Sequence, residues 1–165
     1  MLSIFTDLNV PYMLADKSLV HMWINCSVGK QALSFQIYLP WWRNNRYFLK
    51  HGMKKRGFEL KRVFGKLTQS FGYQEVWRYH GKRLKLFSNI YEGDYNRVGL
   101  WVGKNLYPCY MKVTGIARHK WLGGLSVLAP FPLEEALQSA YGPRFPKNDP
   151  NPFVFFCLGT KAKQT

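Results

Sequence analysis

The stretch GKRLKLFSNIYEGD, from Gly81 to Asp94, constrains the fold most, because its residues alternate like the two faces of a β-strand. One face would carry Leu84, Leu86, Ser88 and Ile90, and the other Lys85, Phe87, Asn89 and Tyr91. A lysine near the middle of such a strand is costly to bury unless it is paired. We therefore expect Lys85 to lie at a sheet edge, to line a cleft, or to replace a residue that once had a function there.

The first half of the chain predicts a mixture of helices and strands. Residues 1–39 predict a short helix or turn followed by apolar stretches, of which SFQIYLP (34–40) has the composition of a strand. Residues 41–58 carry apolar side chains at roughly helical spacing, which predicts an amphipathic helix that ends near Gly57. Glycines divide residues 59–91 into β-type runs, which predicts a meander of strands.

The second half of the chain gives weaker signals, with one exception. Residues 96–108 are rich in glycine and predict a loop with strand fragments, and residues 123–130 predict a short strand. Residues 131–146 predict a helix, with a proline in its first turn, two glutamates near its positive end and Gly142 as its C-terminal cap. Residues 147–165 are rich in proline and asparagine and predict an irregular tail.

The positive charge of the chain is unevenly distributed. The 165 residues are 47% hydrophobic, which suits one domain with a real core. The net charge is +15, and the segment from Arg43 to Lys85 holds thirteen Lys or Arg against only Glu59 and Glu75. Such a field attracts nucleic acid, phosphorylated small molecules or an anionic membrane surface. A solvated basic face without a ligand fits the same pattern.

Several function classes lack their signatures in this sequence. There is no P-loop, GxSxG elbow, HExxH or dinucleotide fingerprint, and the four histidines have no ligand spacing. The three cysteines are widely spaced without a CxxC pair, which indicates neither a zinc site nor a disulfide framework. No run of 18 apolar residues predicts a transmembrane helix, and the acidic start does not predict a signal peptide.

Three stretches, residues 8–26, 57–94 and 107–146, follow the motifs of one protein family in order. The residues that fit those motifs are Pro11, Tyr12, Leu14, Leu19, Phe64, Gly65, Lys66, Leu84, Phe87, Tyr91, Glu92, Val127, Pro130, Leu137, Tyr141, Gly142 and Pro146. Together the stretches resemble the fukutin/LicD family, and specifically its fukutin-like branch. Lys17 and His21 depart from the pattern, because they stand where the family has glycines.

The resemblance implies an α/β fold of the α+β type for residues 1–146, a nucleotidyltransferase-like domain with a mixed sheet and flanking helices. It also implies that strand 84–91 lies beside strand 33–39. Family members transfer a phosphorylated alcohol, such as ribitol phosphate or phosphocholine, from a CDP-linked donor to a glycan. Two aspartates of a DxD on one strand, and a third aspartate on a neighbouring strand, hold Mg²⁺ against the donor diphosphate.

The sequence lacks aspartates at all three positions that match those metal ligands. Ala32 and Ser34 stand in the DxD, and Lys85 stands at the third position. The resemblance therefore implies a pseudoenzyme without a metal cofactor, which binds a phosphorylated ligand or a partner in protein glycosylation. We expect Lys85, Lys66 and Lys30 to contact that ligand, a CDP-linked or other phosphorylated small molecule or a glycoprotein glycan. An active paralogue is a further expected partner.

Two other hypotheses remain open at this point. In the first, the chain is an active phosphoalcohol transferase whose Mg²⁺ or Mn²⁺ site has moved to Glu92, Asp94 and Asp16. In the second, it is a nucleic-acid-binding module, which rests only on charge and aromatic content and which the resemblance argues against. Relatives work in the Golgi or endoplasmic reticulum behind an N-terminal anchor, or in the bacterial cytoplasm. We expect either a partial chain without its anchor or a cytoplasmic protein.

Overall fold

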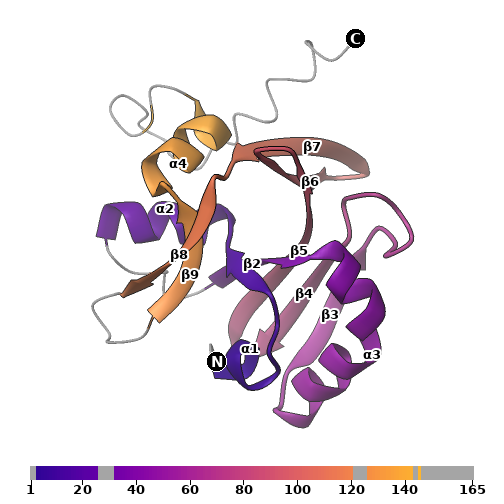
Figure 1. Ribbon diagram of the computed structural model, residues 1–165. Helices are drawn as coiled ribbons and strands as arrows, with labels where there is room; N and C mark the ends of the chain where they lie inside the picture. Colours follow the sequence, from indigo (N-terminus) through magenta and orange to yellow (C-terminus); the bar gives the residue numbers. More distant parts are fainter. Residues whose placement is uncertain (1–2, 26–31, 121–125, 143–144, 146–165) are drawn as a thin grey trace.

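The computed structural model describes residues 3–25, 32–120, 126–142 and 145, and its main body is a mixed sheet with helices packed on both faces (Figure 1). The helices are α1 (Ser3–Asp7), α2 (Asp16–Asn25), α3 (Leu39–Lys55) and α4 (Leu133–Tyr141). The strands are β1 (Tyr12–Leu14), β2 (Ala32–Tyr38), β3 (Glu59–Phe64), β4 (Gln74–Tyr79), β5 (Lys82–Glu92), β6 (Tyr95–Val102), β7 (Asn105–Lys112), β8 (Gly115–Lys120) and β9 (Ser126–Phe131).

The main sheet contains seven of these strands. Its order is β1-β2-β5-β4-β3, with β6 paired to β5 and β7 paired to β6. Strands β2 and β5 are parallel, and all the other pairs are antiparallel, including the separate pair β8–β9. The predicted α/β fold with a mixed sheet is confirmed, and so is the prediction that strand 84–91 lies beside strand 33–39.

Helix α3 makes the parallel pairing possible, because parallel strands need a crossover connection rather than a tight turn. It begins at Leu39, directly after β2, with a proline at its first positions, where the missing N–H costs nothing. It ends at Lys55, and Lys54 and Lys55 in its last turn complement the negative end of the helix dipole. The predicted helix over residues 41–58 is confirmed, with its start two residues earlier.

The sheet face under α3 holds one part of the hydrophobic core. Phe35 and Trp77 are fully buried on this face. The ring of Phe5 from α1 lies 5.0 Å from the ring of Phe35, and Trp42 from α3 meets Tyr73 edge-on at 4.9 Å. The residues that alternate with these along the strands face the other side of the sheet. That other side carries the candidate site.

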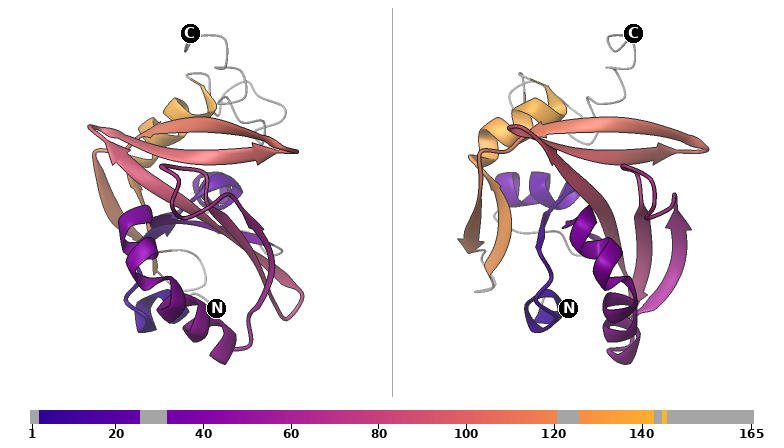
Figure 2. Two further views of the ribbon diagram at one scale, coloured as in Figure 1. Left: turned by 90° about the vertical axis from the view of Figure 1, so that its right-hand side faces the viewer. Right: turned by 45° about the vertical axis from the view of Figure 1, so that its right-hand side comes forward.

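The prediction of a loop over residues 96–108 is wrong. Strands β6 and β7 form a hairpin that lies across the top of the sheet in both views of Figure 2. Gly103, with φ of 61°, supplies the left-handed residue of the turn. Gly99 lies inside β6. This position needs a glycine, because a Cβ there would come within 2.4 Å of the Cα of Gly72. That glycine therefore marks a close approach of two backbones and not a loop.

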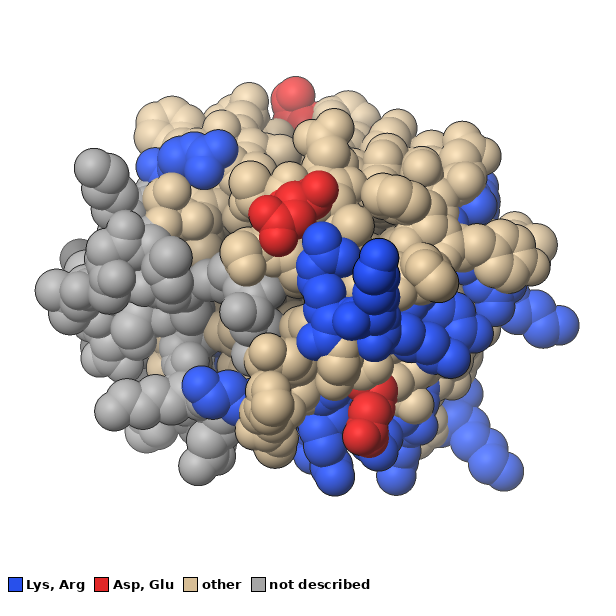
Figure 3. Space-filling view, turned by 90° about the horizontal axis from the view of Figure 1, so that it is seen from below, with Lys and Arg blue, Asp and Glu red and all other residues tan. Residues whose placement is uncertain are grey.

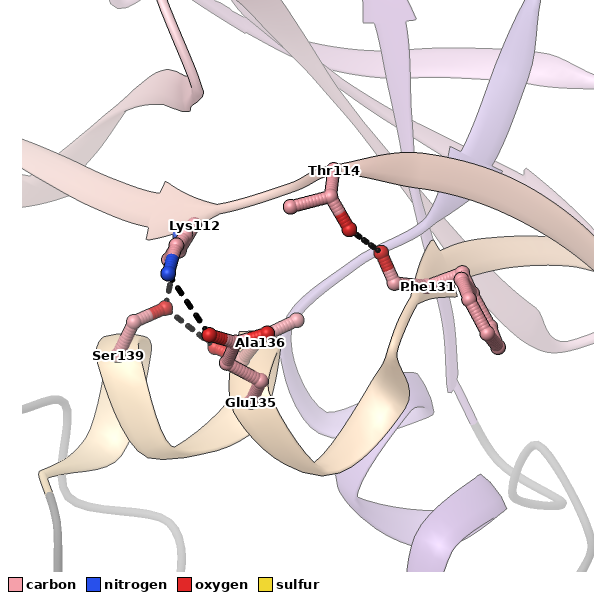
Figure 4. A network of polar contacts seen from close by, with 6 residues as sticks. All are labelled: Lys112, Thr114, Phe131, Glu135, Ala136 and Ser139. Carbon is pink, nitrogen blue, oxygen red and sulfur yellow. Dashed lines mark hydrogen bonds and ion pairs between the residues drawn. The ribbon is translucent and has the colours of Figure 1, made fainter.

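Polar contacts hold α4 against the end of β7 (Figure 4). The backbone N–H of Lys112 donates to Oγ of Ser139 at 2.8 Å, and its Nζ lies 2.8 Å from Oε1 of Glu135. The hydroxyl of Thr114 donates to the carbonyl of Phe131 at 2.9 Å, which joins the chain after β7 to the end of β9. These contacts attach α4 and the β8–β9 pair to the main sheet.

The remaining sequence predictions have mixed outcomes. The helix predicted within residues 131–146 is confirmed but shorter, because Pro132 precedes its first turn as the N-cap residue and Gly142, with φ of 101°, ends it. The strand predicted over residues 123–130 corresponds to β9, Ser126–Phe131. Residues 123–125 lie outside the described residues. Helix α2 was not predicted. The predicted tail, residues 147–165, lies outside the described residues.

Candidate functional site

The pairing of β2 with β5 brings together the three positions that the resemblance assigns to metal ligands. Ser34 lies directly opposite Lys85, and Ala32 lies opposite Arg83. Residues two apart in a strand point to the same face, so these four share one side of the sheet. Strand β5 lies between β2 and β4, and Lys85 is therefore not at a sheet edge. It lines a groove instead.

This groove runs over the face of β3, β4 and β5 that lies opposite α3. Its volume is about 360 Å³. It is lined by the cations Lys61, Arg62, Arg78, Arg83 and Lys85, by Phe64, Gln74, Val76 and Trp101, and by Trp77 of β4, whose ring is buried on the α3 side of the sheet. None of these lining residues is a carboxylate. We call it the basic groove.

The strand register forces like charges together in the basic groove. Arg78 on β4 lies directly opposite Arg83 on β5, and Val76 separates Arg62 from Lys85 one row further along. Like charges directly opposite each other on adjacent strands destabilise a sheet. Among the groove residues that the structure describes, Lys61 forms an ion pair with the exposed carboxylate of Glu59, which also lies opposite Arg78 on β3. An anion between Arg78 and Arg83 would relieve the repulsion.

The opposite end of the basic groove is aromatic. The rings of Phe64 and Trp101 are stacked, with centroids 6.3 Å apart and planes 29° apart. Nε1 of Trp101 donates to the carbonyl of Gly72 at 2.6 Å, and this bond holds the indole against the backbone at Gly72. Arg78 lies four positions after Gln74 on β4, and Gln74 is paired with Phe64, so the two ends lie about 13 Å apart along the strand.

The other two predicted ligand contacts are not found in the basic groove. Lys66 is exposed and does not belong to the residues that line it, and its backbone N–H is bonded to Oε1 of Gln69 at 3.1 Å. Lys30 lies outside the described residues.

Sequence reasoning missed the three arginines of the basic groove. Arg62, Arg78 and Arg83 lie on three different strands, and their proximity depends on the strand order. A signal was present in RYHGKRLK, residues 78–85, because the glycine marks a turn and the cations before and after it must then face each other across the hairpin. That signal gives the Arg78–Arg83 pair but not Arg62.

Asp16, at the start of α2, is a buried carboxylate next to the basic groove but not part of its lining. Its Oδ1 has no hydrogen-bond partner in the described part of the chain, and Asp16 lies with Gln36, Cys109 and Tyr110 at a small cavity of about 40 Å³. Burial raises the pKa of Asp16, and the positive charge of Lys85 opposes that rise. The electrostatic influence of Lys85 thus reaches from the groove into this cavity.

The relocated metal site is not supported by the structure. Asp16 lies at the start of α2, whereas Glu92 and Asp94 flank the turn between β5 and β6. Glu92 is paired with Arg97 at 3.0 Å. Among the residues that the structure describes, no group of three or more His, Cys, Asp or Glu side chains could hold a metal ion. The hypothesis that these three carboxylates form one site is therefore corrected.

The surface around the basic groove is also cationic. Figure 3 shows Lys and Arg side chains gathered at the lower end of the molecule, with few carboxylates among them. This is the end where α3 stops, β3 begins and β4 turns into β5. No helix among the described residues is long and apolar enough to cross a membrane.

Comparison with known proteins adds no further assignment. No protein-family model matches the chain, and no curated protein matches it.

Proposed function

We propose that the chain is a degenerate domain of the fukutin/LicD type, with a nucleotidyltransferase-like fold, that binds a phosphorylated ligand in the basic groove without metal-dependent catalysis. One observation carries the proposal: Arg78, Arg83 and Lys85 crowd one face of the sheet with no carboxylate among the groove residues. Lys85 lies where the resemblance expects the third metal ligand. The parallel neighbour of Lys85, Ser34, lies where the resemblance expects the second aspartate of the DxD.

The arrangement of the cations favours a phosphate or diphosphate as the anion. Arginine presents a planar fork of donors that matches phosphate oxygens in pairs, and Arg78 and Arg83 lie directly opposite each other on adjacent strands. Lys85 adds a compact charge one row further along the same face. Together these three cations would neutralise the negative charge of a diphosphate. In family members a bound metal ion has that role.

The aromatic end of the groove favours a nucleotide over a simple phosphate. Any nucleotide base can stack on an aromatic side chain, because every base has a flat π-face. Trp101 and Phe64 supply an aromatic surface of this kind. The groove volume of about 360 Å³ falls within the range of small-molecule sites. A CDP-linked compound, with its phosphates near the arginines and its base near Trp101, fits both ends.

The same residues argue against transfer chemistry. Hard divalent cations need several oxygen ligands at about 2.0–2.6 Å, and Ala32 and Lys85 supply none. A lysine is a point charge and cannot coordinate or polarise a phosphoryl oxygen as a divalent ion does. Binding through fixed cations needs no metal, and so the ligand would be held but not cleaved. The role in protein glycosylation would then be that of a non-catalytic binder, acting alone or with an active paralogue.

The test is calorimetric titration of the full chain with CDP and CDP-ribitol, with and without Mg²⁺. We expect binding that does not depend on Mg²⁺ and weakens as salt is added. A charge-assisted contact contributes roughly 1.5–3 kcal/mol, so Lys85→Ala should weaken CDP binding about tenfold or more. Lys104→Ala is the matched control, because Lys104 is an exposed lysine at the β6–β7 turn and not among the groove residues.

Two results would contradict the proposal. Equal CDP affinity for the parent and Lys85→Ala proteins would remove Lys85 from the site. A strict requirement for Mg²⁺, or transfer of ribitol phosphate to a glycan acceptor, would show that the chain is a metal-dependent enzyme.

A further inference from the structure

A second surface of the molecule, the outer side of α3, has no role in the basic groove. Trp42 of α3 packs on Tyr73, and charges on α3 act on Glu75, which places the helix on the Tyr73–Glu75 side of β4. The groove residues Gln74 and Arg78 alternate with these and face the other way. In Figures 1 and 2 no described helix or strand covers the outer side of α3.

This outer side combines exposed aromatic residues with the positive charges of Lys54 and Lys55, which are both exposed. Tyr47 is 81% exposed and Phe48 is 53% exposed, whereas Leu49 and Met53 on the inner side are buried. The helix contains Arg43, Arg46, Lys50, Lys54 and Lys55 and not one carboxylate. None of the ion pairs among the described residues involves Lys54 or Lys55.

We propose that the outer side of α3 docks onto an anionic lipid surface. Amphipathic helices that lie in a membrane interface carry aromatic residues together with Lys and Arg. Lys and Arg near an anionic leaflet contribute attraction while their stems extend along the interface. Tyr47 and Phe48 would enter the headgroup region, and Lys54 and Lys55 would meet the lipid phosphates.

Lipid fits this surface better than nucleic acid. The side chain of Phe48 has no polar atom, and the exposed ring of Tyr47 lies 5.9 Å from the guanidinium carbon of Arg46. Nucleic-acid sites that stack bases combine their aromatic residues with a positively charged groove that follows the backbone. A convex helix meets a flat bilayer more readily. The inner residues of α3 stay in the protein core, so docking needs no unfolding.

The test is sedimentation of the full chain with vesicles of phosphatidylcholine alone and of phosphatidylcholine mixed with phosphatidylserine. We expect binding only to the mixed vesicles. Lys54→Gln with Lys55→Gln should lower the affinity about thirtyfold. Tyr47→Ser with Phe48→Ser should lower it about tenfold, and these exposed positions leave the core intact.

Matched variants separate docking by α3 from general attraction to a basic protein. Tyr95→Ser removes a tyrosine that is 46% exposed on β6, and Lys104→Gln with Arg118→Gln removes the same two charges from exposed positions outside α3. Both should lower vesicle affinity much less than the α3 variants do. In the parent protein, backbone hydrogen exchange should slow in residues 46–55 only when mixed vesicles are present.

Three results would overturn the proposal. The first is unchanged vesicle affinity in the Tyr47→Ser, Phe48→Ser protein. The second is an equal loss in the Lys104→Gln, Arg118→Gln protein. The third is tighter binding of a single-stranded oligonucleotide that is lost with Tyr47 and Phe48, because the surface would then belong to nucleic acid.

Discussion

At the scale of single residues, Glu75 shows how one buried charge is accommodated inside the sheet. Its carboxylate accepts hydrogen bonds from the hydroxyl of Tyr73 at 2.6 Å and from Nε1 of Trp77 at 2.7 Å. Burial raises the pKa of Glu75, and the two hydrogen bonds oppose that rise without cancelling it. The same burial, together with the neighbouring carboxylate, raises the pKa of Tyr73. Glu75 therefore joins Tyr73 and Trp77 on one side of β4, at some cost in electrostatic free energy.

The raised pKa of Glu75 gives stability a defined pH dependence. The folded state holds the proton of Glu75 more tightly than the unfolded state, so this residue contributes most below the ordinary pKa of 4.5. Its contribution falls as pH rises through the raised pKa. The difference in the free energy of unfolding between the parent and Glu75→Gln proteins should therefore decrease with rising pH. Urea denaturation across that pH range measures it, and a difference that grows with pH would contradict the assignment.

Gly99 is the residue that lets the β6–β7 hairpin reach the rest of the sheet. Gly99→Ala would place a Cβ 2.4 Å from the Cα of Gly72 and 2.7 Å from Leu106, and backbone cannot move aside cheaply. We expect a loss of about 1–3 kcal/mol in the free energy of unfolding, as for other overpacked positions. Gly115→Ala is the control, because no atom lies within 4 Å of the added Cβ. Similar effects of the two substitutions would argue against the close contact.

At the scale of elements, the β6–β7 hairpin forms the aromatic wall of the basic groove. It is joined to β2 and β5 by buried amides, since Asn89 donates to Asn96 at 2.7 Å and Asn96 donates to Gln36. The bond from Nε1 of Trp101 to the carbonyl of Gly72 holds the indole at the end of the groove. The hairpin therefore decides whether the site accepts a base beside the phosphates.

If Trp101 stacks on a base, its loss should affect nucleotides more than inorganic anions. We expect Trp101→Ala to weaken CDP binding about tenfold, because base stacking on an aromatic residue contributes roughly 1–3 kcal/mol. Pyrophosphate binding should stay unchanged. Trp101→Phe also loses the bond to Gly72 but keeps an aromatic face, and so it should retain most of the CDP affinity. Equal losses for CDP and pyrophosphate would mean that the indole supports the groove rather than the base.

At the scale of the whole molecule, positive charge is concentrated on two sides of one sheet. The basic groove occupies one side of β4 and β5, and α3 occupies the other. Both sides share the lower end of the molecule, where Arg56 reaches Asp7 at 4.0 Å in a weak exposed pair. In our proposals this positive charge, part of the net charge of +15, attracts two separate anionic partners: a phosphorylated ligand at the basic groove and an anionic lipid surface at α3.

Restoring the carboxylates tests whether the strand arrangement is that of a former metal site. The variant Ala32→Asp, Ser34→Asp, Lys85→Asp would place three aspartates on one face of adjacent parallel strands. We expect it to bind CDP only in the presence of Mg²⁺ or Mn²⁺, because carboxylates supply the oxygen ligands these ions require. The parent protein should show no specific metal site in the same titration.

The control is the triple variant with asparagine at these three positions, which has nearly the same volume and no negative charge. It should show no dependence on Mg²⁺. Failure of the aspartate variant to gain such dependence, while it remains folded, would mean that β2 and β5 do not form a metal site of the family type.

The sequence by itself determined the features that depend on neighbours along the chain. The alternation in residues 84–91, the helix predicted over 41–58 and the cap at Gly142 arise from local backbone preferences, and all three are found in the structure, the helix with bounds of Leu39–Lys55. The uneven charge and the absence of three aspartates are also readable without coordinates. Strand partners could be inferred for β2 and β5 only because the family resemblance supplied them.

Tertiary structure alone decided which side chains meet. Arg62 joins Arg78 and Arg83 because β3, β4 and β5 are adjacent, a fact that no local pattern contains. The glycines of residues 96–108 indicated a loop, yet Gly99 is required by its contact with Gly72, 27 residues earlier in the chain. Helix and turn signals act over a few residues, whereas strand order and burial depend on contacts between distant segments. The candidate site is made of such contacts.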